Sequence, residues 1–138
     1  MRGTQIVENL SMDSLTLSKF RGVFASDKLP VHVPVDQFCI CNTDTWKNEG
    51  KHWILIYFPP EGVTEFFDPL GNRPSAEFVR FMGDTYLYNT KRYQPLNSNT
   101  CAYYCLFFAF MKSRGLKYQS ILDLMGTEKI VVRFVLNL

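Results

Sequence analysis

The apolar and polar positions of the chain predict a short helix near its amino terminus, followed by an extended segment. Apolar residues at helical spacing indicate a helix over residues 13–20, capped by Asp13 or Ser14 and ended by Gly22. Two prolines then make residues 27–37 an extended connection, because proline disfavours helix in the residue before it.

Three strands are predicted in the middle of the chain, at residues 38–42, 52–58 and 63–68. The sequence Pro-Pro-Glu-Gly between the last two is a turn, so these strands are expected to form an antiparallel hairpin. The run HWILIYF is apolar enough to be a central strand. Residues 86–94 alternate well enough to be a further strand.

The second half of the chain is predicted to be largely helical. Ser75 can cap a helix formed by AEFVRFM. The stretch CAYYCLFFAFMKSR is apolar on every side, which predicts a helix buried in the middle of the fold and ended by Gly115. Residues 121–125 suggest a short helix closed by Gly126, and residues 130–138 fit either a last helix or a strand.

This order of elements predicts an α+β fold rather than a regular alternation of strand and helix. We expect an antiparallel or mixed sheet packed against the buried central helix, with short peripheral helices. The length of 138 residues suits one domain over residues 1–138. No apolar run reaches the roughly 18 residues of a membrane span, and the first residues lack the apolar centre of a secretory signal. The net charge of +2 gives no indication of nucleic-acid binding.

The four cysteines do not form a recognisable metal-binding pattern. The spacing of Cys39 and Cys41 in FCIC matches no common zinc motif, and the chain has only two histidines. We therefore expect no metal or cofactor, and we interpret the cysteines as reduced thiols.

Cys101 is a candidate nucleophile because it begins the apolar helix directly after the polar run NSNT. With Thr100 or Asn99 as cap, its sulfur lies in the first helical turn, where unpaired N–H groups and the helix dipole stabilise an anion. The thiolate is the nucleophilic form of cysteine. Cys105, one turn deeper, is expected to be an inert core residue. Taken alone, a position like that of Cys101 is more often structural.

Three further polar residues can join Cys101 in a site. His52 opens the most apolar strand and Asp68 ends the next one, so a hairpin returns both to the same end of the sheet. A carboxylate beside an imidazole fixes its tautomer and stabilises the imidazolium. Gln94, seven residues before Cys101, can return over the intervening loop and donate a hydrogen bond to an oxyanion. Each residue also has a plain alternative, as a surface histidine, a turn aspartate or a loop glutamine. His32 lies between prolines and is treated as incidental.

The order of these residues resembles the adenovirus-type cysteine proteases, a family with members in DNA viruses and virus-like DNA transposons. The segments FRGVFASDKLP, KHWILIYF, FDPLG and NSNTCAYYCLFFAFM carry the resemblance over most of the chain. It implies His52 as general base, Asp68 as its orienting acid, Gln94 as oxyanion donor and Cys101 as nucleophile, with Trp53 packed beside the site. It also implies an endopeptidase that needs no cofactor, acts through a thioester and cleaves viral or virus-like precursor proteins at Gly-containing sites.

The resemblance further implies a polypeptide as partner, a monomer, no membrane association, and action in the virion or the host nucleus or cytoplasm. Two features depart from the family. Ala102 stands where the family usually has Gly, which adds a methyl group near the oxyanion region. Residues 82–93 contain no cysteine, so activation by a disulfide-linked peptide is not expected, and the small net charge does not favour activation by DNA.

Two other functions remain open at this point. An isopeptidase for ubiquitin-like modifiers would share the same order of His, Asp, Gln and Cys. A binding module that has lost catalysis is favoured only by Ala102, whereas retention of all four polar residues argues against it.

Overall fold

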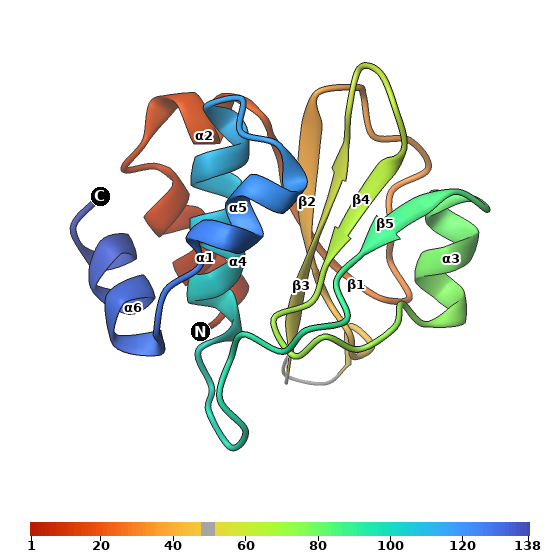
Figure 1. Ribbon diagram of the computed structural model, residues 1–138. Helices are drawn as coiled ribbons and strands as arrows, with labels where there is room; N and C mark the ends of the chain where they lie inside the picture. The colour runs from red at the N-terminus through yellow and green to blue at the C-terminus, as the bar shows by residue number, and fades with distance from the viewer. Residues whose placement is uncertain (48–51) are drawn as a thin grey trace.

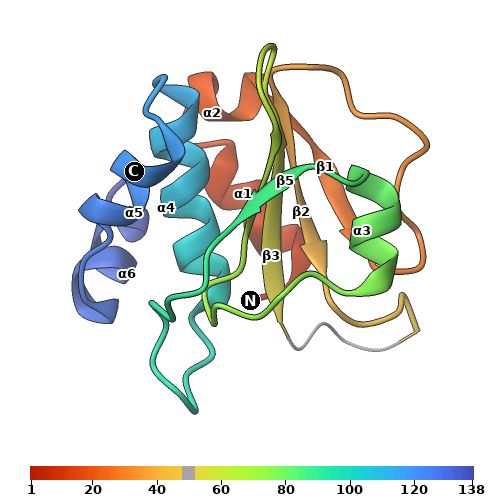
Figure 2. The same ribbon diagram turned by 45° about the vertical axis from the view of Figure 1, so that its right-hand side comes forward.

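The structure is a computed structural model that describes residues 1–47 and 52–138. Its centre is a mixed five-stranded sheet with helices on both faces. Figures 1 and 2 show most of the helices on one face of the sheet and a single helix on the other. The helices are α1 (Gly3–Leu10), α2 (Ser14–Ser18), α3 (Ala76–Met82), α4 (Cys101–Ser113), α5 (Tyr118–Leu124) and α6 (Glu128–Leu136). Helix α3 is the one that stands apart, and α4 lies between the sheet and α6. No helix among the described residues is long and apolar enough to cross a bilayer.

The strands lie in the sheet in the order in which they occur in the chain. They are β1 (Phe20–Ala25), β2 (Gln37–Asn42), β3 (Trp53–Phe58), β4 (Thr64–Phe67) and β5 (Tyr86–Tyr88). The two outer pairs, β1–β2 and β4–β5, are parallel, and the inner pairs are antiparallel. The predicted α+β class, with a mixed sheet and a buried central helix, is confirmed.

The predicted hairpin is formed by β3 and β4. Leu55 pairs with Phe67 and Tyr57 with Glu65, in antiparallel register. The start of β3 and the end of β4 therefore lie at the same end of the sheet. This arrangement brings the residues that flank these two strands close to one another.

The alternating side chains of the inner strands fill two separate cores. On β3, Trp53, Leu55 and Tyr57 face the core under α4. The intervening Ile54 and Ile56 face the smaller core under α3. All five side chains are buried, which explains why this strand is apolar at every position.

One predicted boundary near the amino terminus is wrong, and one helix there was missed. The helix predicted at residues 13–20 ends at Ser18, and Phe20 instead begins β1, where it pairs with Phe38. Its ring packs 5.4 Å from that of Phe38, so a tertiary contact overrides the local helical pattern. Helix α1 was not predicted at all. Its only buried residues are Ile6 and Leu10, one turn apart, and two buried positions in a mostly polar stretch make a weak signal.

The later elements follow the sequence more closely. The strand predicted at 86–94 is limited to Tyr86–Tyr88, since the residues after it form the loop that leads to α4. The segment left open at 130–138 is helical, and α6 buries Val131 and Val135 against α4. As predicted, Gly115 follows α4, with a φ of +86° that favours glycine.

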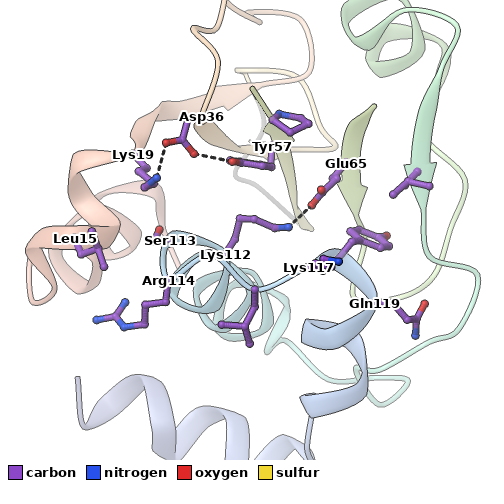
Figure 3. A pocket seen from close by; sticks show the side chains of 15 residues that line it. Leu15, Lys19, Asp36, Tyr57, Glu65, Lys112, Ser113, Arg114, Lys117 and Gln119 are labelled. Atoms are coloured by element: carbon purple, nitrogen blue, oxygen red, sulfur yellow. Dashed lines mark hydrogen bonds and ion pairs between the residues drawn. The ribbon is translucent and has the colours of Figure 1, made fainter. Parts of the chain in front are cut away.

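A buried ion pair ties the far end of α4 to the sheet. Figure 3 shows the Lys112 ammonium directed toward Glu65, with its nitrogen 2.8 Å from Oε1. Both residues line a cavity of about 840 Å³, next to a chain of polar contacts from Lys19 to Asp36 to Tyr57. This cavity lies at the end of β3 opposite His52 and contains none of the predicted site residues.

Candidate active site

The hairpin and the start of α4 bring three predicted site residues into contact. His52 immediately precedes β3 and Asp68 immediately follows β4. The His52 Nε2 atom lies 2.5 Å from Oδ1 of Asp68. The imidazole also forms a hydrogen bond with the side chain of Cys101, the first residue of α4. Because Nε2 is engaged by the carboxylate, Nδ1 is the nitrogen left to meet the sulfur.

Mutual hydrogen bonding shifts the pKa values of the sulfur and the imidazole in opposite directions. Burial alone would lower the pKa of His52, but its hydrogen bonds to Asp68 and Cys101 outweigh burial and raise that pKa to about 9. Burial also opposes ionisation of Cys101, yet the hydrogen bonds from His52 and from the backbone hold its pKa below the usual range. The pair is thus suited to exist as thiolate and imidazolium near neutral pH.

The backbone of Trp53 connects α4 to the central strand β3. Its N–H donates to the Cys101 sulfur at 3.3 Å, and its carbonyl accepts from the Cys105 thiol at 3.5 Å. Cys105 is fully buried, and burial raises its pKa well above the ordinary value. It therefore acts here as a neutral hydrogen-bond donor, in line with the prediction that it is a core residue.

No side chain of the described residues caps the backbone N–H groups at the start of α4. Thr100 is the N-cap, but its side chain makes no capping hydrogen bond. The Ala102 N–H instead contributes a hydrogen bond that stabilises the Cys101 thiolate and lowers its pKa. Ala102 itself is fully buried.

The turn after β4 holds the Asp68 carboxylate in place. The Leu70 N–H donates to Oδ1 at 2.8 Å, the same atom that contacts His52. The buried Asn89 accepts from the Asp68 N–H at 2.9 Å and donates to its carbonyl at 2.6 Å. We did not identify Asn89 from the sequence, which placed it inside the strand predicted over 86–94, whereas β5 ends one residue before it.

Gln94 is anchored to the same turn, and its hydrogen bonds within the described residues go to Pro69 and Ser98 rather than to Cys101. Its backbone N–H donates to the Pro69 carbonyl at 3.0 Å. Its side chain is buried, and Nε2 donates to the Ser98 carbonyl at 2.7 Å, inside the loop that leads to Cys101. Its role as an oxyanion donor stays a prediction.

Two cavities border the residues that contact Cys101. One, of about 300 Å³, is lined on one side by His52 and Asp68 and includes the segment from Leu70 to Ser75. The other, of about 450 Å³, is lined by Trp53 together with Met1 and Trp46. Cys101 itself lines neither of these two cavities, although His52 lines one, Trp53 lines the other, and both residues form hydrogen bonds with the Cys101 side chain.

The remaining candidate residues lie away from this site. Cys39 and Cys41 are buried in the core under α3, with their sulfurs 3.6 Å apart as free thiols. His32 lies in an exposed loop. Across residues 1–47 and 52–138, no group of three or more His, Cys, Asp or Glu side chains is arranged so that it could hold a metal ion.

Comparison with known proteins relates the chain to a viral protease. No protein-family model matches the chain. A stretch of 47 residues is 36% identical to the "SUMO-1 cysteine protease" of several African swine fever virus isolates, and covers 32% of this chain and 17% of the viral protein. The match thus spans less than a fifth of the length of that curated relative.

The crystal structure of the ASFV pS273R protease shares the fold over almost the whole chain. The two superpose with a TM-score of 0.68 at 19% identity, covering 96% of this chain and 64% of the viral one. The Se-Met form of the same protease gives a TM-score of 0.67, at 98% and 66% coverage. The chain therefore has the fold of this viral protease.

Proposed function

We propose that the chain is a cysteine endopeptidase of the adenovirus type, with Cys101 as nucleophile, His52 as general base and acid, and Asp68 as the group that orients His52. The carrying observation is the continuous contact from sulfur to imidazole to carboxylate. The shared fold and the matched segment, both from viral proteins named as cysteine proteases, support it.

The first half-reaction forms a thioester. The Cys101 thiolate attacks the carbonyl carbon of the scissile bond, and the negative charge moves to the carbonyl oxygen. The backbone N–H groups at the start of α4 and the Gln94 amide are the proposed donors to this oxyanion. The C–N bond then breaks as the His52 imidazolium gives its proton to the departing amine.

The second half-reaction restores the enzyme. Neutral His52 takes a proton from water while the water oxygen attacks the thioester carbon. The C–S bond breaks, the acid product leaves, and the thiolate–imidazolium pair is regenerated. Asp68 stabilises the positive charge on His52 at the start and end of each cycle, without itself taking up the proton.

We further propose that the substrate is a viral or virus-like precursor protein cut at a Gly-containing site, within the virion or the infected cell. This specificity rests on the resemblance to the adenovirus-type family and on the viral origin of the matched proteins. Glycine next to the scissile bond allows a close approach of the substrate backbone, which suits a nucleophile on Cys101, a residue that is only 4% exposed.

A deconjugating protease for ubiquitin-like modifiers is the second candidate. The observation in its favour is that the matched viral relative carries the name "SUMO-1 cysteine protease". Such modifiers are cut after a C-terminal glycine, so the two candidates differ in what precedes that glycine. Comparing hydrolysis of a SUMO-1 C-terminal fluorogenic conjugate with that of a short Gly-Gly-Xaa peptide distinguishes them.

The proposed reaction is tested by labelling and activity in parallel. Limiting iodoacetamide at pH 7 is expected to alkylate Cys101 first and to abolish peptide hydrolysis, whereas the fully buried thiols of Cys39, Cys41 and Cys105 react only after unfolding. The Cys101→Ala variant should be inactive. Loss of activity through alkylation of Cys105, or an active Cys101→Ala variant, would refute the assignment.

A further inference from the structure

The loop of residues 95–99 controls where the Gln94 side chain points. It projects beyond the start of α4 in Figures 1 and 2 and joins Gln94 to the nucleophile. Within the described part of the chain, the Gln94 amide makes one hydrogen bond, from Nε2 to the Ser98 carbonyl, and its buried Oε1 atom has no partner. The orientation of this amide therefore depends on the position of Ser98.

Ser98 is in turn held by a directed chain of hydrogen bonds. Its hydroxyl lies 3.1 Å from Oε1 of Glu128 and 2.6 Å from the Thr100 hydroxyl. A hydroxyl has a single proton to donate, and the carboxylate can only accept. Ser98 therefore donates to Glu128, and it accepts from the Thr100 hydroxyl and the Thr100 N–H. This use of the Thr100 hydroxyl also explains why it does not cap α4.

Glu128 is fixed relative to the nucleophile helix. It lies in the first turn of α6, where the helix dipole favours a carboxylate. The same helix packs on α4 through Phe134, whose ring lies 5.1 Å from Phe107 and 4.9 Å from Phe110. A residue near the carboxyl end of the chain is thereby held at a set distance from the loop before Cys101.

We propose that Glu128, acting through Ser98, is a positioning residue for the Gln94 amide. The inference rests on the proposed function, in which that amide donates to the oxyanion. One Nε2 hydrogen is occupied by the Ser98 carbonyl, which leaves the second hydrogen of the same group for the substrate oxygen. Without Glu128, the Ser98 hydroxyl loses its charged acceptor, the loop can shift, and the amide no longer points in a fixed direction.

Peptide-aldehyde binding and alkylation separate this role from a general effect on the site. An aldehyde adds to the thiolate and forms an oxyanion, whereas iodoacetamide requires only the thiolate. We expect Glu128→Ala to lower both kcat/KM and aldehyde affinity about tenfold, because small misplacements of a catalytic donor are costly. The rate of iodoacetamide alkylation should be unchanged. Glu128→Gln retains an acceptor for Ser98 and should stay within about threefold of wild type.

The decisive experiment is a double-mutant cycle with Gln94→Ala. If Glu128 acts through Gln94, then Glu128→Ala has no further effect on kcat/KM in the Gln94→Ala background. Equal effects in both backgrounds would overturn the inference and leave the proposed protease function intact. Ser98→Ala provides a second route to the same cycle if Glu128→Ala fails to fold.

Two further comparisons complete the test. Glu77→Ala removes a first-turn acid from α3, away from the loop, and should behave like wild type in every assay. A wild-type protein that is alkylated at Cys101 but neither hydrolyses peptides nor binds aldehydes would overturn the proposed function, and this inference with it.

Discussion

At the scale of single residues, the contact between His52 and Asp68 decides over which pH range the site is charged correctly. The carboxylate and the sulfur raise the pKa of His52 to about 9, against the opposing effect of burial. Burial opposes ionisation of Cys101, but hydrogen bonds from His52 and the backbone lower the pKa of its thiol below the ordinary value. The thiolate–imidazolium pair therefore exists above the pKa of Cys101, and it is lost as pH rises through about 9.

Asp68→Asn is expected to narrow this range from the alkaline side. The amide cannot stabilise the imidazolium, so the pKa of His52 falls and the alkaline limb of the pH–activity profile moves to lower pH by at least about one unit. Activity at pH 7 should fall about 100-fold or more. Thiolate absorbance near 240 nm should also decrease.

Asp84→Asn is the matched control, because Asp84 is an exposed acid outside the site. It should leave both the profile and the absorbance unchanged. An unaltered alkaline limb in Asp68→Asn would show that Asp68 does not set the charge on His52.

The positions of single residues in the candidate site were predictable from the sequence only where local chemistry was enough. Cys101 could be identified by its place between a polar loop and an apolar helix, and the hairpin brought His52 and Asp68 together. Asn89 could not be found in this way. Its importance comes from contacts with the backbone of Asp68, 21 residues earlier, and an asparagine after a strand is otherwise an ordinary loop residue.

At the scale of elements, the turn after β4 joins two parts of the site. The Pro69 carbonyl accepts from the N–H groups of Tyr93 and Gln94, and the Gly71 N–H donates to the Asp68 carbonyl. The turn therefore sets the position of the Asp68 carboxylate and of the segment that carries Gln94. Gly71 allows this close packing because its φ is +75° and the backbone of residues 90 and 91 lies directly against it.

Gly71→Ala is expected to destabilise the protein more than the matched variant Gly62→Ala. A methyl group at Gly71 would lie 2.9 Å from backbone atoms of Lys91, whereas one at Gly62 would meet nothing within 4 Å. Both positions have positive φ, so Gly62→Ala should cost only the conformational penalty of about 1 kcal/mol. Gly71→Ala should cost about 3 kcal/mol and also reduce activity.

Urea denaturation of the two variants measures the difference in the free energy of unfolding. Equal losses of stability would mean that the turn can move away from residues 90 and 91. In that case the close contact at Gly71 would not be what holds Asp68 in position.

The elements that the sequence predicted well are those with strong local signals. The apolar run of α4, the turn between β3 and β4, and the Ser75 cap of α3 each define an element within a few residues. Phe20 was assigned to a helix because its spacing from Leu15 and Leu17 is compatible with one. Its pairing with β2 depends on residues almost twenty positions away, which no local pattern records.

At the scale of the whole molecule, α4 is the element through which the sheet and the helical layer are joined. Its first residue contacts His52 and Trp53, and its last turn carries Lys112, whose ammonium pairs with Glu65 of β4. The ammonium also lies 5.2 Å from the centre of the Tyr57 ring. The sequence predicted a buried α4, but no local pattern indicated that Lys112 would be a buried partner of Glu65.

Lys112→Met is expected to destabilise the fold because it leaves the Glu65 carboxylate buried without a counter-charge. Loss of one partner of a buried ion pair costs about 3–5 kcal/mol. The double variant Lys112→Met/Glu65→Leu removes both charges and should recover most of this loss. For comparison, Arg114→Met breaks a pair with Asp13 whose arginine is 32% exposed, and should cost about 1 kcal/mol or less.

The pH dependence of the single variant gives an independent check. Burial raises the pKa of Glu65, with Lys112 acting in the opposite direction, so removal of Lys112 raises it further. Folded Lys112→Met then binds a proton more readily than the unfolded chain, and its stability declines as pH rises through the interval between the two pKa values. The difference in the free energy of unfolding between wild type and Lys112→Met should therefore become smaller at acidic pH. A double variant no more stable than Lys112→Met, or a deficit independent of pH, would mean that water reaches Glu65 and that the pair does not join the two layers.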